Sequence, residues 1–273
     1  MPCWRLACTI SSVPGKRRAD LLLVERGLAE SRAQAQRLIM AGQVRAGGEI
    51  IHKPSDLVET STSLEVRGGP RFVSRGGEKL AAALAAFQPA VAGAVCADVG
   101  ASTGGFTDCL LQYGAAKVYA IDVGKGQLHW RLRKDPRVVV MEGVNARYLA
   151  GLPEPVQIVT VDAAFISLRL LLPRIVSWLE PHAEVIALVK PQFEVGRQSV
   201  GKGGVVRDAG LHREAVVSVA QAARKLALGP VGLIRSPITG PKGNIEFLLH
   251  LRLGDPCIDM NELIGDIFPP AEE

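Results

Sequence analysis

Two charged residues stand at the ends of apolar segments, at positions where many α/β proteins handle ligands. Asp162 ends the segment 156–162, and Lys190 ends the segment 184–190. Both segments have the composition of buried strands, and open α/β sheets bind ligands beyond the carboxyl ends of their strands. Neither charge is needed for folding there. We therefore expect this carboxylate and this ammonium group to project toward a bound ligand.

Two further charges occupy positions that folding alone does not favour. Lys79 lies near the start of a predicted helix, where a positive charge opposes the helix dipole. Glu246 lies in the otherwise apolar segment 243–251. A charge in such a strand usually faces solvent or a sheet edge, so Glu246 becomes a candidate only together with the other three residues.

A glycine-rich turn at 98–108 is the best local signal for a ligand site. It follows a buried strand and leads into a helix, so glycines let the backbone approach a ligand and the helix presents free N–H groups. The dinucleotide pattern G-x-G-x-x-G is absent. The pattern D-x-G-x-S-x-G-G instead resembles the first motif of class I S-adenosylmethionine methyltransferases. The candidate cofactor-binding residues here are Asp98, Gly100, Ser102, Thr103, Gly104, Gly105, Phe106 and Thr107.

Residues after the next strands extend this candidate cofactor site. Asp122 ends the strand that follows, and an acidic residue roughly 20 positions after the loop suits a grip on ribose hydroxyls. Asn145 and Arg147 follow the third strand, where such enzymes contact adenine. A glycine-rich loop by itself is equally typical of a tight βα connection, but the loop, the spacing and Asp122 together favour cofactor binding. The full set adds Val123 and Asp162.

Apolar segments alternate with helical segments from residue 75 onward, which predicts a mostly parallel sheet with helices on both faces. The uncharged stretch 80–97 is broken by Gln88, Pro89 and Gly93, so helix, loop and strand fit it better than a membrane span. We predict an α/β domain over 75–255 with a seven-stranded Rossmann-like methyltransferase sheet, followed by a tail over 256–273. The predicted strands cover 94–100, 117–123, 138–144, 156–162, 184–190, 231–236 and 246–253.

Residues 17–66 form a second, small α+β unit. We expect Asp20 to cap a helix over 21–27 and Ser31 to cap a helix over 32–42, with short strands at 43–51 and 63–67. The segment resembles the alpha-L RNA-binding domain first known from a small-subunit ribosomal protein, in which the capped second helix and its arginines face RNA. The resemblance implies seven RNA-binding candidates, namely Lys16, Arg17, Arg18, Ser31, Arg32, Gln36 and Arg37. Residues 1–16 are an expected disordered extension, and 67–74 an expected linker.

The charge of this unit suits a polyanionic partner, and the cysteine usage of the chain suits the cytoplasm. Residues 1–70 hold 10 Lys and Arg against 7 Asp and Glu, and the remaining 203 residues hold 22 against 20, so the positive excess per residue is larger in the first part. A polyanionic partner suits this excess, although a solubilising surface would look the same. The five cysteines form no C-x-x-C pair and no zinc-like spacing, so we predict reduced thiols in the cytoplasm and no metal site.

The four charged residues complete a resemblance that covers about residues 17–255. Lys79, Asp162, Lys190 and Glu246 match, in order, the K-D-K-E tetrad of ribose 2′-O-methyltransferases. With the alpha-L domain in front, the chain closely resembles the hemolysin-A (TlyA) type of ribosomal RNA cytidine 2′-O-methyltransferase. Further matching stretches are 74–79, 162–168, 189–194 and 201–207. The resemblance implies S-adenosylmethionine as cofactor and ribosomal RNA or ribosomal subunits as partner, with neither a membrane nor an obligate protein partner.

The resemblance also implies a role for each tetrad residue. Lys190 would either accept the proton of the ribose hydroxyl or, remaining charged, stabilise the developing alkoxide. Asp162 would orient Lys190, and Glu246 and Lys79 would complete the polar network. Glycine-rich loops at 201–204 and 236–243 add further candidates for phosphate contact, with ordinary flexible loops as the equal alternative. These are Lys202, Arg207 and Lys242, with Lys125, Arg131 and Arg133 as weaker ones.

Three other functions remain open at this point. The first is a non-catalytic RNA-binding or ribosome assembly factor that keeps the fold, against which the intact tetrad argues. The second is a membrane-active cytolysin, for which the sequence offers no span and no long basic amphipathic helix. The third is a methyltransferase for a small molecule or a protein, which the N-terminal unit disfavours.

Overall fold

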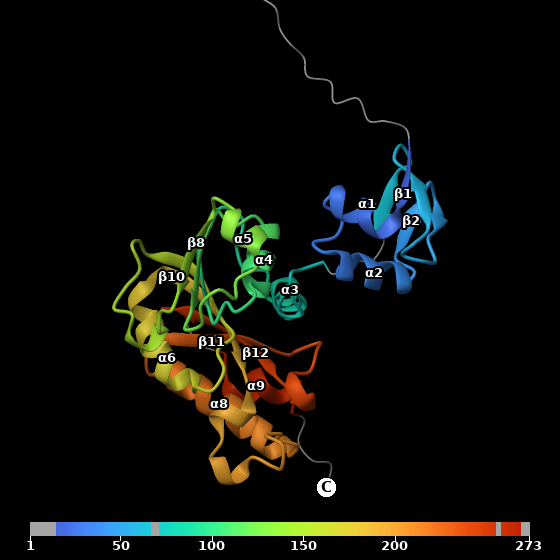
Figure 1. Ribbon diagram of the computed structural model, residues 1–273. Coiled ribbons are helices and arrows are strands. Elements are labelled where there is room, and N and C mark those ends of the chain that lie inside the picture. The colour runs from blue at the N-terminus through green and yellow to red at the C-terminus, as the bar shows by residue number, and fades with distance from the viewer. Residues whose placement is uncertain (1–14, 67–70, 255–257, 269–273) are drawn as a thin grey trace, which may run out of the picture. The chain divides into compact units, whose positions relative to one another are not determined.

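A computed structural model of the protein describes residues 15–66, 71–254 and 258–268, in two compact units that divide after Arg71 (Figure 1). The expected extension falls mostly on 1–14, which lie outside the described residues, as do 67–70 of the expected linker. Lys16, the last residue of that expected extension, instead begins the first strand. The first unit has one apolar core and the second unit has two, and no residue belongs to the cores of both units.

The first unit is a small α+β domain, as predicted. Its core gathers Leu22 and Leu23 from the first helix, Ile39 from the second, and Val44 from a strand. One sheet has two antiparallel strands and the other has three, in the orders β1-β4 and β3-β2-β5. The elements are β1 (Lys16–Arg18), α1 (Ala19–Glu25), α2 (Arg32–Met40), β2 (Val44–Ala46), β3 (Glu49–Ile50), β4 (Leu57–Glu59) and β5 (Leu64–Val66).

The two predicted helix caps have different outcomes. The Ser31 hydroxyl accepts a hydrogen bond from the Gln34 backbone N–H at 3.2 Å, so the predicted cap of α2 is confirmed. The predicted cap of α1 is wrong, because the helix begins at Ala19 and Arg18 occupies the cap position without a side-chain bond. Asp20 lies inside the first turn and is fully buried.

The second unit is the predicted seven-stranded, mostly parallel sheet, with strand order β11-β12-β10-β9-β6-β7-β8. The direction of β12 is opposite to that of the other six strands, and it lies between β10 and β11. The two strands on either side of the glycine-rich turn, β6 and β7, pair in parallel, as buried strands of an α/β sheet do. The strands are β6 (Val95–Val99), β7 (Lys117–Asp122), β8 (Val138–Glu142), β9 (Val156–Val161), β10 (Leu179–Val189), β11 (Leu228–Arg235) and β12 (Phe247–Leu253).

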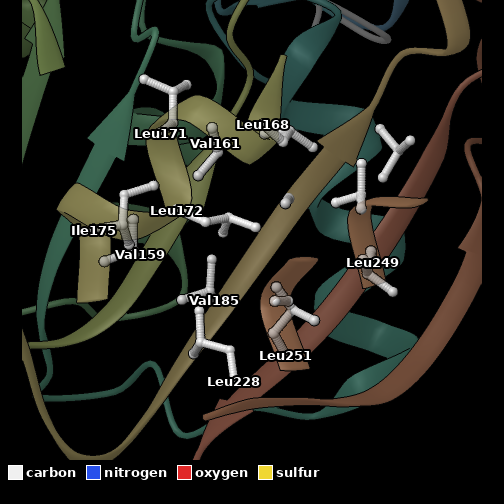
Figure 2. Close-up of a cluster of buried hydrophobic side chains, with 14 of the residues drawn as sticks. Val159, Val161, Leu168, Leu171, Leu172, Ile175, Val185, Leu228, Leu249 and Leu251 are labelled. Atoms are coloured by element: carbon white, nitrogen blue, oxygen red, sulfur yellow. The ribbon is translucent and has the colours of Figure 1, made fainter. Parts of the chain in front are cut away.

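Helices cover both faces of this sheet. Leu80 and Leu110, from α3 and α4, pack in the core on one face, whereas Leu172 and Val219, from α6 and α8, pack in the core on the other. Figure 2 shows the second core. The helices are α3 (Gly76–Phe87), α4 (Gly105–Gln112), α5 (Trp130–Lys134), α6 (Leu168–Ile175), α7 (Pro191–Glu194), α8 (Ala209–Arg224) and α9 (Met260–Gly265), with short 3-10 turns η1 (Ala146–Tyr148), η2 (Val176–Trp178), η3 (Arg197–Ser199) and η4 (Pro241–Gly243).

Both ends of the second unit extend beyond the segment predicted from the sequence. Phe72, assigned to the linker by its position, is buried against Gly77 at the start of α3. In the segment expected to be a tail, Leu263 and Ile264 of α9 are buried in the core that α6 and α8 cover. Residues 255–257 and 269–273 lie outside the described residues. No helix in the described part of the chain is both long and apolar enough to span a membrane.

Candidate active site

The glycine-rich turn between β6 and α4 lies directly against the backbone of Asp162. Gly100 has a φ of +82°, and a Cβ built on it would lie 2.6 Å from the Asp162 carbonyl oxygen. Only glycine adopts this φ without strain and leaves room for that approach. The turn and the end of β9 are therefore held in contact by the absence of a side chain.

Asp98 and Thr107 lie behind the turn rather than in a cavity. Both are fully buried, and the Asp98 carboxylate accepts hydrogen bonds from the Thr107 hydroxyl at 2.7 Å and the Thr160 hydroxyl at 3.0 Å. Burial raises the pKa of Asp98 to about 7, against the effect of these hydrogen bonds. Both residues were predicted as cofactor contacts, and their hydrogen bonds tie β6 to α4 and β9.

A cavity of about 390 Å³ opens beside the turn, at the carboxyl ends of β6, β7 and β9. Asp122 lines it, and its two carboxylate oxygens accept backbone hydrogen bonds from Ser102 at 2.8 Å and Gly124 at 2.6 Å. Asn145 also lines this cavity, but Arg147 does not and instead lies 5.5 Å from the Tyr148 ring. The remaining predicted residues on this wall are Gly100, Ser102, Val123 and Asp162.

A second cavity of about 220 Å³ adjoins the first, because Gly100, Ser102 and Asp162 line both. Its walls include Lys79 and the predicted residues Thr103, Gly105 and Phe106. A Cβ on Gly105 would lie 2.2 Å from the Ser74 hydroxyl, so this glycine allows α3 to pack closely on α4. Gly104 lines neither of these two cavities and lies against α5, because a Cβ built on it would be 2.1 Å from the Leu132 side chain.

The four predicted catalytic residues form two ion pairs at this edge of the sheet. Lys190 Nζ lies 2.5 Å from Asp162 Oδ1, and Lys79 Nζ lies 2.5 Å from Glu246 Oε2. The lysine side chains are only 11% and 10% exposed, so both pairs are largely shielded from solvent. Removing one member of such a pair leaves a poorly solvated charge, which is costly.

The cavities connect the two ion pairs. Lys79 and Asp162 both line the cavity of about 220 Å³, and Lys190 and Glu246 both line a third cavity of about 380 Å³. The structure therefore brings all four side chains to one place, although Lys79 and Glu246 are 167 residues apart in the chain. Gly240 makes room for Glu246, because a Cβ there would lie 2.1 Å from Glu246 Oε1.

The sequence interpretation missed an aromatic pair between the cavities. Phe165 has a φ of +63°, is 92% exposed, and lines both the 390 Å³ cavity and the 380 Å³ cavity. Its ring centroid lies 5.3 Å from that of Phe193. An exposed aromatic ring offers a stacking surface for a planar ligand. The signal was present in the sequence, since Phe165 and Phe193 each follow a tetrad residue by three positions.

A buried carboxylate ties the loop that carries Phe165 to helix α7, which carries Phe193. Glu194 accepts hydrogen bonds from the Ser167 hydroxyl at 2.6 Å and from the Leu168 backbone N–H at 2.8 Å. Arg169 Nη2 in turn donates to the Glu194 carbonyl oxygen at 3.0 Å. Burial raises the pKa of Glu194. The loop after Asp162 is thereby fixed to the helix that follows Lys190.

The predicted RNA-binding residues of the first unit lie on β1 and α2. Lys16 and Arg17 are exposed on β1, where Arg17 pairs with Glu25. Arg37 lies in the last turn of α2, while Ser31 caps the start of that helix. The three remaining candidates, Arg18, Arg32 and Gln36, all donate hydrogen bonds to Asp20.

The remaining basic candidates lie on the second unit. Lys202 is exposed in the tight turn closed by the bridge between Gly201 and Val205, and Arg207 is exposed just after it. Lys242 occupies η4, and Lys125 lies exposed between β7 and α5. Arg131 lies over the Trp130 ring, whereas Arg133 pairs with Glu142 at 2.5 Å.

Comparison with known proteins assigns both units to families. Residues 72–253, more than half of the chain, match the model of the FtsJ-like methyltransferases, and residues 17–63 match the S4 domain. The chain belongs to the FtsJ-like methyltransferase family. Within it the chain belongs to the TlyA type, as its curated relatives show. The protein named "16S/23S rRNA (cytidine-2'-O)-methyltransferase TlyA" from Mycobacterium tuberculosis is 51% identical over 241 residues, covering 86% of this chain and 89% of the relative.

Two other proteins match over a similar share of the chain. The Bacillus subtilis protein named "Putative rRNA methyltransferase YqxC" is 50% identical over 243 residues, 86% of this chain and 85% of the relative. A solved structure described as "Putative hemolysin from Streptococcus thermophilus" is 42% identical with a TM-score of 0.69, covering 92% of this chain and 95% of the other. The predicted family and the predicted α/β fold with an S4 domain in front are thus confirmed.

Proposed function

We propose that this TlyA-type protein transfers a methyl group from S-adenosylmethionine to a ribose 2′-hydroxyl of ribosomal RNA, with cytidine as the target nucleoside. The observation that carries the proposal is the Lys190–Asp162 ion pair, which stands where the cavity beside the glycine turn meets the cavity lined by Lys190 and Glu246. The relatives named as rRNA methyltransferases support the choice of substrate.

The residues beside the glycine turn fit the adenosine part of S-adenosylmethionine. A carboxylate has about four lone-pair sites, and two of those on Asp122 accept backbone N–H groups, so two are left for ribose hydroxyls. Apolar walls suit an adenine ring, and the cavity supplies them. These wall residues are Val99, Ile121, Val144, Ile166 and Leu171.

The smaller cavity fits the amino acid part of the same cofactor. A zwitterionic group needs both signs of charge, and Lys79 and Asp162 line this cavity together. When bound, S-adenosylmethionine supplies an activated methyl group on a positively charged sulfur. The chain must therefore supply position and a better nucleophile, and not activation of the donor.

Lys190 makes the ribose 2′-hydroxyl a better nucleophile. Its Nζ either takes up the hydroxyl proton or remains charged and stabilises the oxygen as negative charge develops. Asp162 holds Nζ by the ion pair at 2.5 Å, and so restricts where the ammonium group points. Lys79 and Glu246 form the second ion pair, and each lines a cavity together with a member of the first pair. Phe165 offers its exposed face to the target base.

The S4 domain is proposed to bind the RNA. We also propose that the protein works in the cytoplasm, which the proposed ribosomal RNA substrate supports. A phosphate backbone is recognised by lysine and arginine side chains and by helix N-termini, and the first unit offers both on β1 and α2. Lys202, Arg207 and Lys242 are proposed as additional phosphate contacts near the site.

Transfer of a labelled methyl group tests the function. The full chain is incubated with methyl-labelled S-adenosylmethionine and with unmethylated 16S and 23S rRNA, free and in subunits, and the RNA is digested to nucleosides. We expect label in 2′-O-methylcytidine, and primer extension then maps the nucleotide. Label on a base would refute ribose methylation, and RNA binding without transfer would support a non-catalytic assembly factor.

A further inference from the structure

We propose that Asp20 is a positioning residue that sets the RNA-binding geometry of Arg18 and Arg32. The inference rests on the proposed function, because it assumes that the S4 domain binds RNA. Asp20 lies in the first turn of α1 with its side chain fully buried, on no wall of the three cavities described above. It therefore belongs to the binding unit and not to the catalytic machinery.

Four donor groups from two elements, β1 and α2, converge on this one carboxylate of α1. Arg18, at the end of β1, donates from Nε at 3.0 Å and from Nη2 at 2.9 Å. Arg32, the first residue of α2, donates from Nε at 2.9 Å, and Gln36, one turn later, donates from Nε2 at 3.1 Å. The carboxylate thus joins β1, α1 and α2 at a single point.

Asp20 holds the guanidinium groups of Arg18 and Arg32 along one edge, and their other edges are exposed to solvent. Asp20 is 0% exposed, whereas the Arg18 and Arg32 side chains are 37% and 54% exposed. No residue in the described part of the chain hydrogen-bonds to Nη1 of Arg18 or to either Nη of Arg32. A guanidinium fixed in this way presents its outer N–H groups in a set direction, which suits the planar grip on a phosphate.

The carboxylate also overcomes a repulsion that would separate these groups. Two guanidinium groups repel each other, and one buried negative charge between them keeps both at the surface of the same unit. The cluster of three charges keeps a net charge of +1. We infer that Asp20 holds the two cations in the arrangement that fits consecutive phosphates, while the side chain itself never reaches the RNA.

Neutralising Asp20 changes both the net charge of the unit and the position of the two arginines. These two changes have opposite effects on RNA binding, which makes the inference testable. Asp20→Asn adds one unit of positive charge, so charge alone would tighten binding to any RNA. Loss of the arginine anchor predicts weaker binding to a fitting RNA. Glu25→Gln is the matched control, because it adds the same charge to the same unit at an exposed residue that pairs only with Arg17 among the described side chains.

The experiment measures binding of the full-length proteins to an rRNA transcript that the wild type methylates, and to poly(U), across a series of salt concentrations. We expect Asp20→Asn to weaken transcript binding about tenfold, with poly(U) binding unchanged or tighter. Glu25→Gln should bind both RNAs at least as tightly as the wild type. Transcript binding by Asp20→Asn at or above the wild-type level would overturn the inference.

A second variant keeps the test decisive if Asp20→Asn destabilises the S4 domain. Arg32→Lys retains the charge at an exposed position but cannot donate from Nε to Asp20 while offering a planar fork outward. We expect it to weaken transcript binding about tenfold with little change in thermal stability. Wild-type binding by Arg32→Lys would contradict the inference. If the wild type bound rRNA but methylated none, the proposed function would be wrong. The inference about Asp20 would still stand.

Discussion

Lys190 is the residue on which the proposed chemistry depends most. We expect Lys190→Ala to lower methyl transfer to rRNA by at least about a hundredfold, because the hydroxyl loses the group that accepts its proton or stabilises its charge. Binding of S-adenosylmethionine should persist, since Lys190 lines neither of the two cavities proposed for the cofactor. Calorimetry and the labelled transfer assay measure the two quantities separately.

The matched control for this prediction is Lys225→Ala. Lys225 is an exposed lysine at the end of α8, and its loss should leave transfer unchanged. Near-normal turnover in Lys190→Ala would refute the assigned role. A parallel loss of cofactor binding would instead point to a structural defect, because Asp162, the counter-charge of Lys190, also borders both proposed cofactor cavities.

Asp98 gives the protein a pH-dependent stability of predictable sign. Its pKa is raised to about 7 by burial, so the folded state keeps the proton up to that pH, whereas the unfolded state releases it near pH 4. Between these values the folded state binds more protons, and the free energy of unfolding therefore falls as pH rises. Above about pH 7 the contribution of Asp98 becomes constant.

We expect Asp98→Asn to remove this part of the pH dependence, since an amide does not titrate in this range. Urea unfolding at pH 5.5 and pH 8 should show a decline in stability that is smaller by about 2 kcal/mol in the variant than in the wild type. Asp266→Asn, at an exposed carboxylate, serves as the control and should keep the wild-type decline. Equal declines in all three proteins would contradict the prediction.

At the scale of elements, Glu194 joins the loop after β9 to the helix after β10. We expect Glu194→Ala to lower the rate of transfer about tenfold or more, because the loop that carries Asp162 and Phe165 loses its attachment beside Lys190. The Kd for S-adenosylmethionine should rise as well, because Asp162 and Ile166 of this loop line the cavity proposed for the adenosine part of the cofactor. Single-turnover transfer rates and calorimetry measure the two effects separately.

Glu194→Gln is the conservative partner of that variant. Its amide oxygen can still accept from the Leu168 N–H, and its amide nitrogen can donate to the Ser167 hydroxyl, so most of the rate should remain. If Glu194→Ala and the wild type transferred at the same rate, the loop after β9 and helix α7 would not depend on this carboxylate for their position.

The elements that sequence predicted best are those fixed by local pattern. The seven strands follow from apolar runs, and the Ser31 cap needs only residues within one turn of helix. The Asp20 cap was wrong because this carboxylate is bound by the neighbouring Arg18 and by Arg32 and Gln36, which lie 12 and 16 residues further along the chain. Helix α9 was missed because a six-residue helix depends on packing, here of Leu263 and Ile264, more than on its own propensity.

The candidate site was predictable in its residues but not in its pairing. Lys79 and Glu246 were predicted as catalytic residues because charged residues are unusual at such positions and because of the family resemblance. Nothing in the sequence, however, links two charges 167 residues apart. Asp98 matched a cofactor motif, but whether such a residue faces the ligand or the core depends on how β6 and β9 pack around it.

At the scale of the whole molecule, the two units have separate cores and separate proposed tasks. We expect a chain of residues 72–273 to fold and to bind S-adenosylmethionine like the full chain, because no core residue of the second unit comes from the first. Its transfer to rRNA should fall about a hundredfold, since a tethered binding unit no longer raises the local concentration of substrate.

Calorimetry with the cofactor and the labelled transfer assay check both halves of this prediction. The full chain is the control for each measurement. Undiminished transfer by residues 72–273 would favour a substrate that the S4 domain does not recognise, such as a small molecule or a protein.

The position of β12 has a consequence for synthesis. This strand is inserted between β10 and β11, although both are made before it, and the residue just before it is the counter-charge of Lys79. A nascent chain that has not reached residue 246 carries a lysine without its partner and two strands with unfilled edges. We therefore expect chains that end before residue 246 to be inactive in methyl transfer, because they lack both β12 and the partner of Lys79.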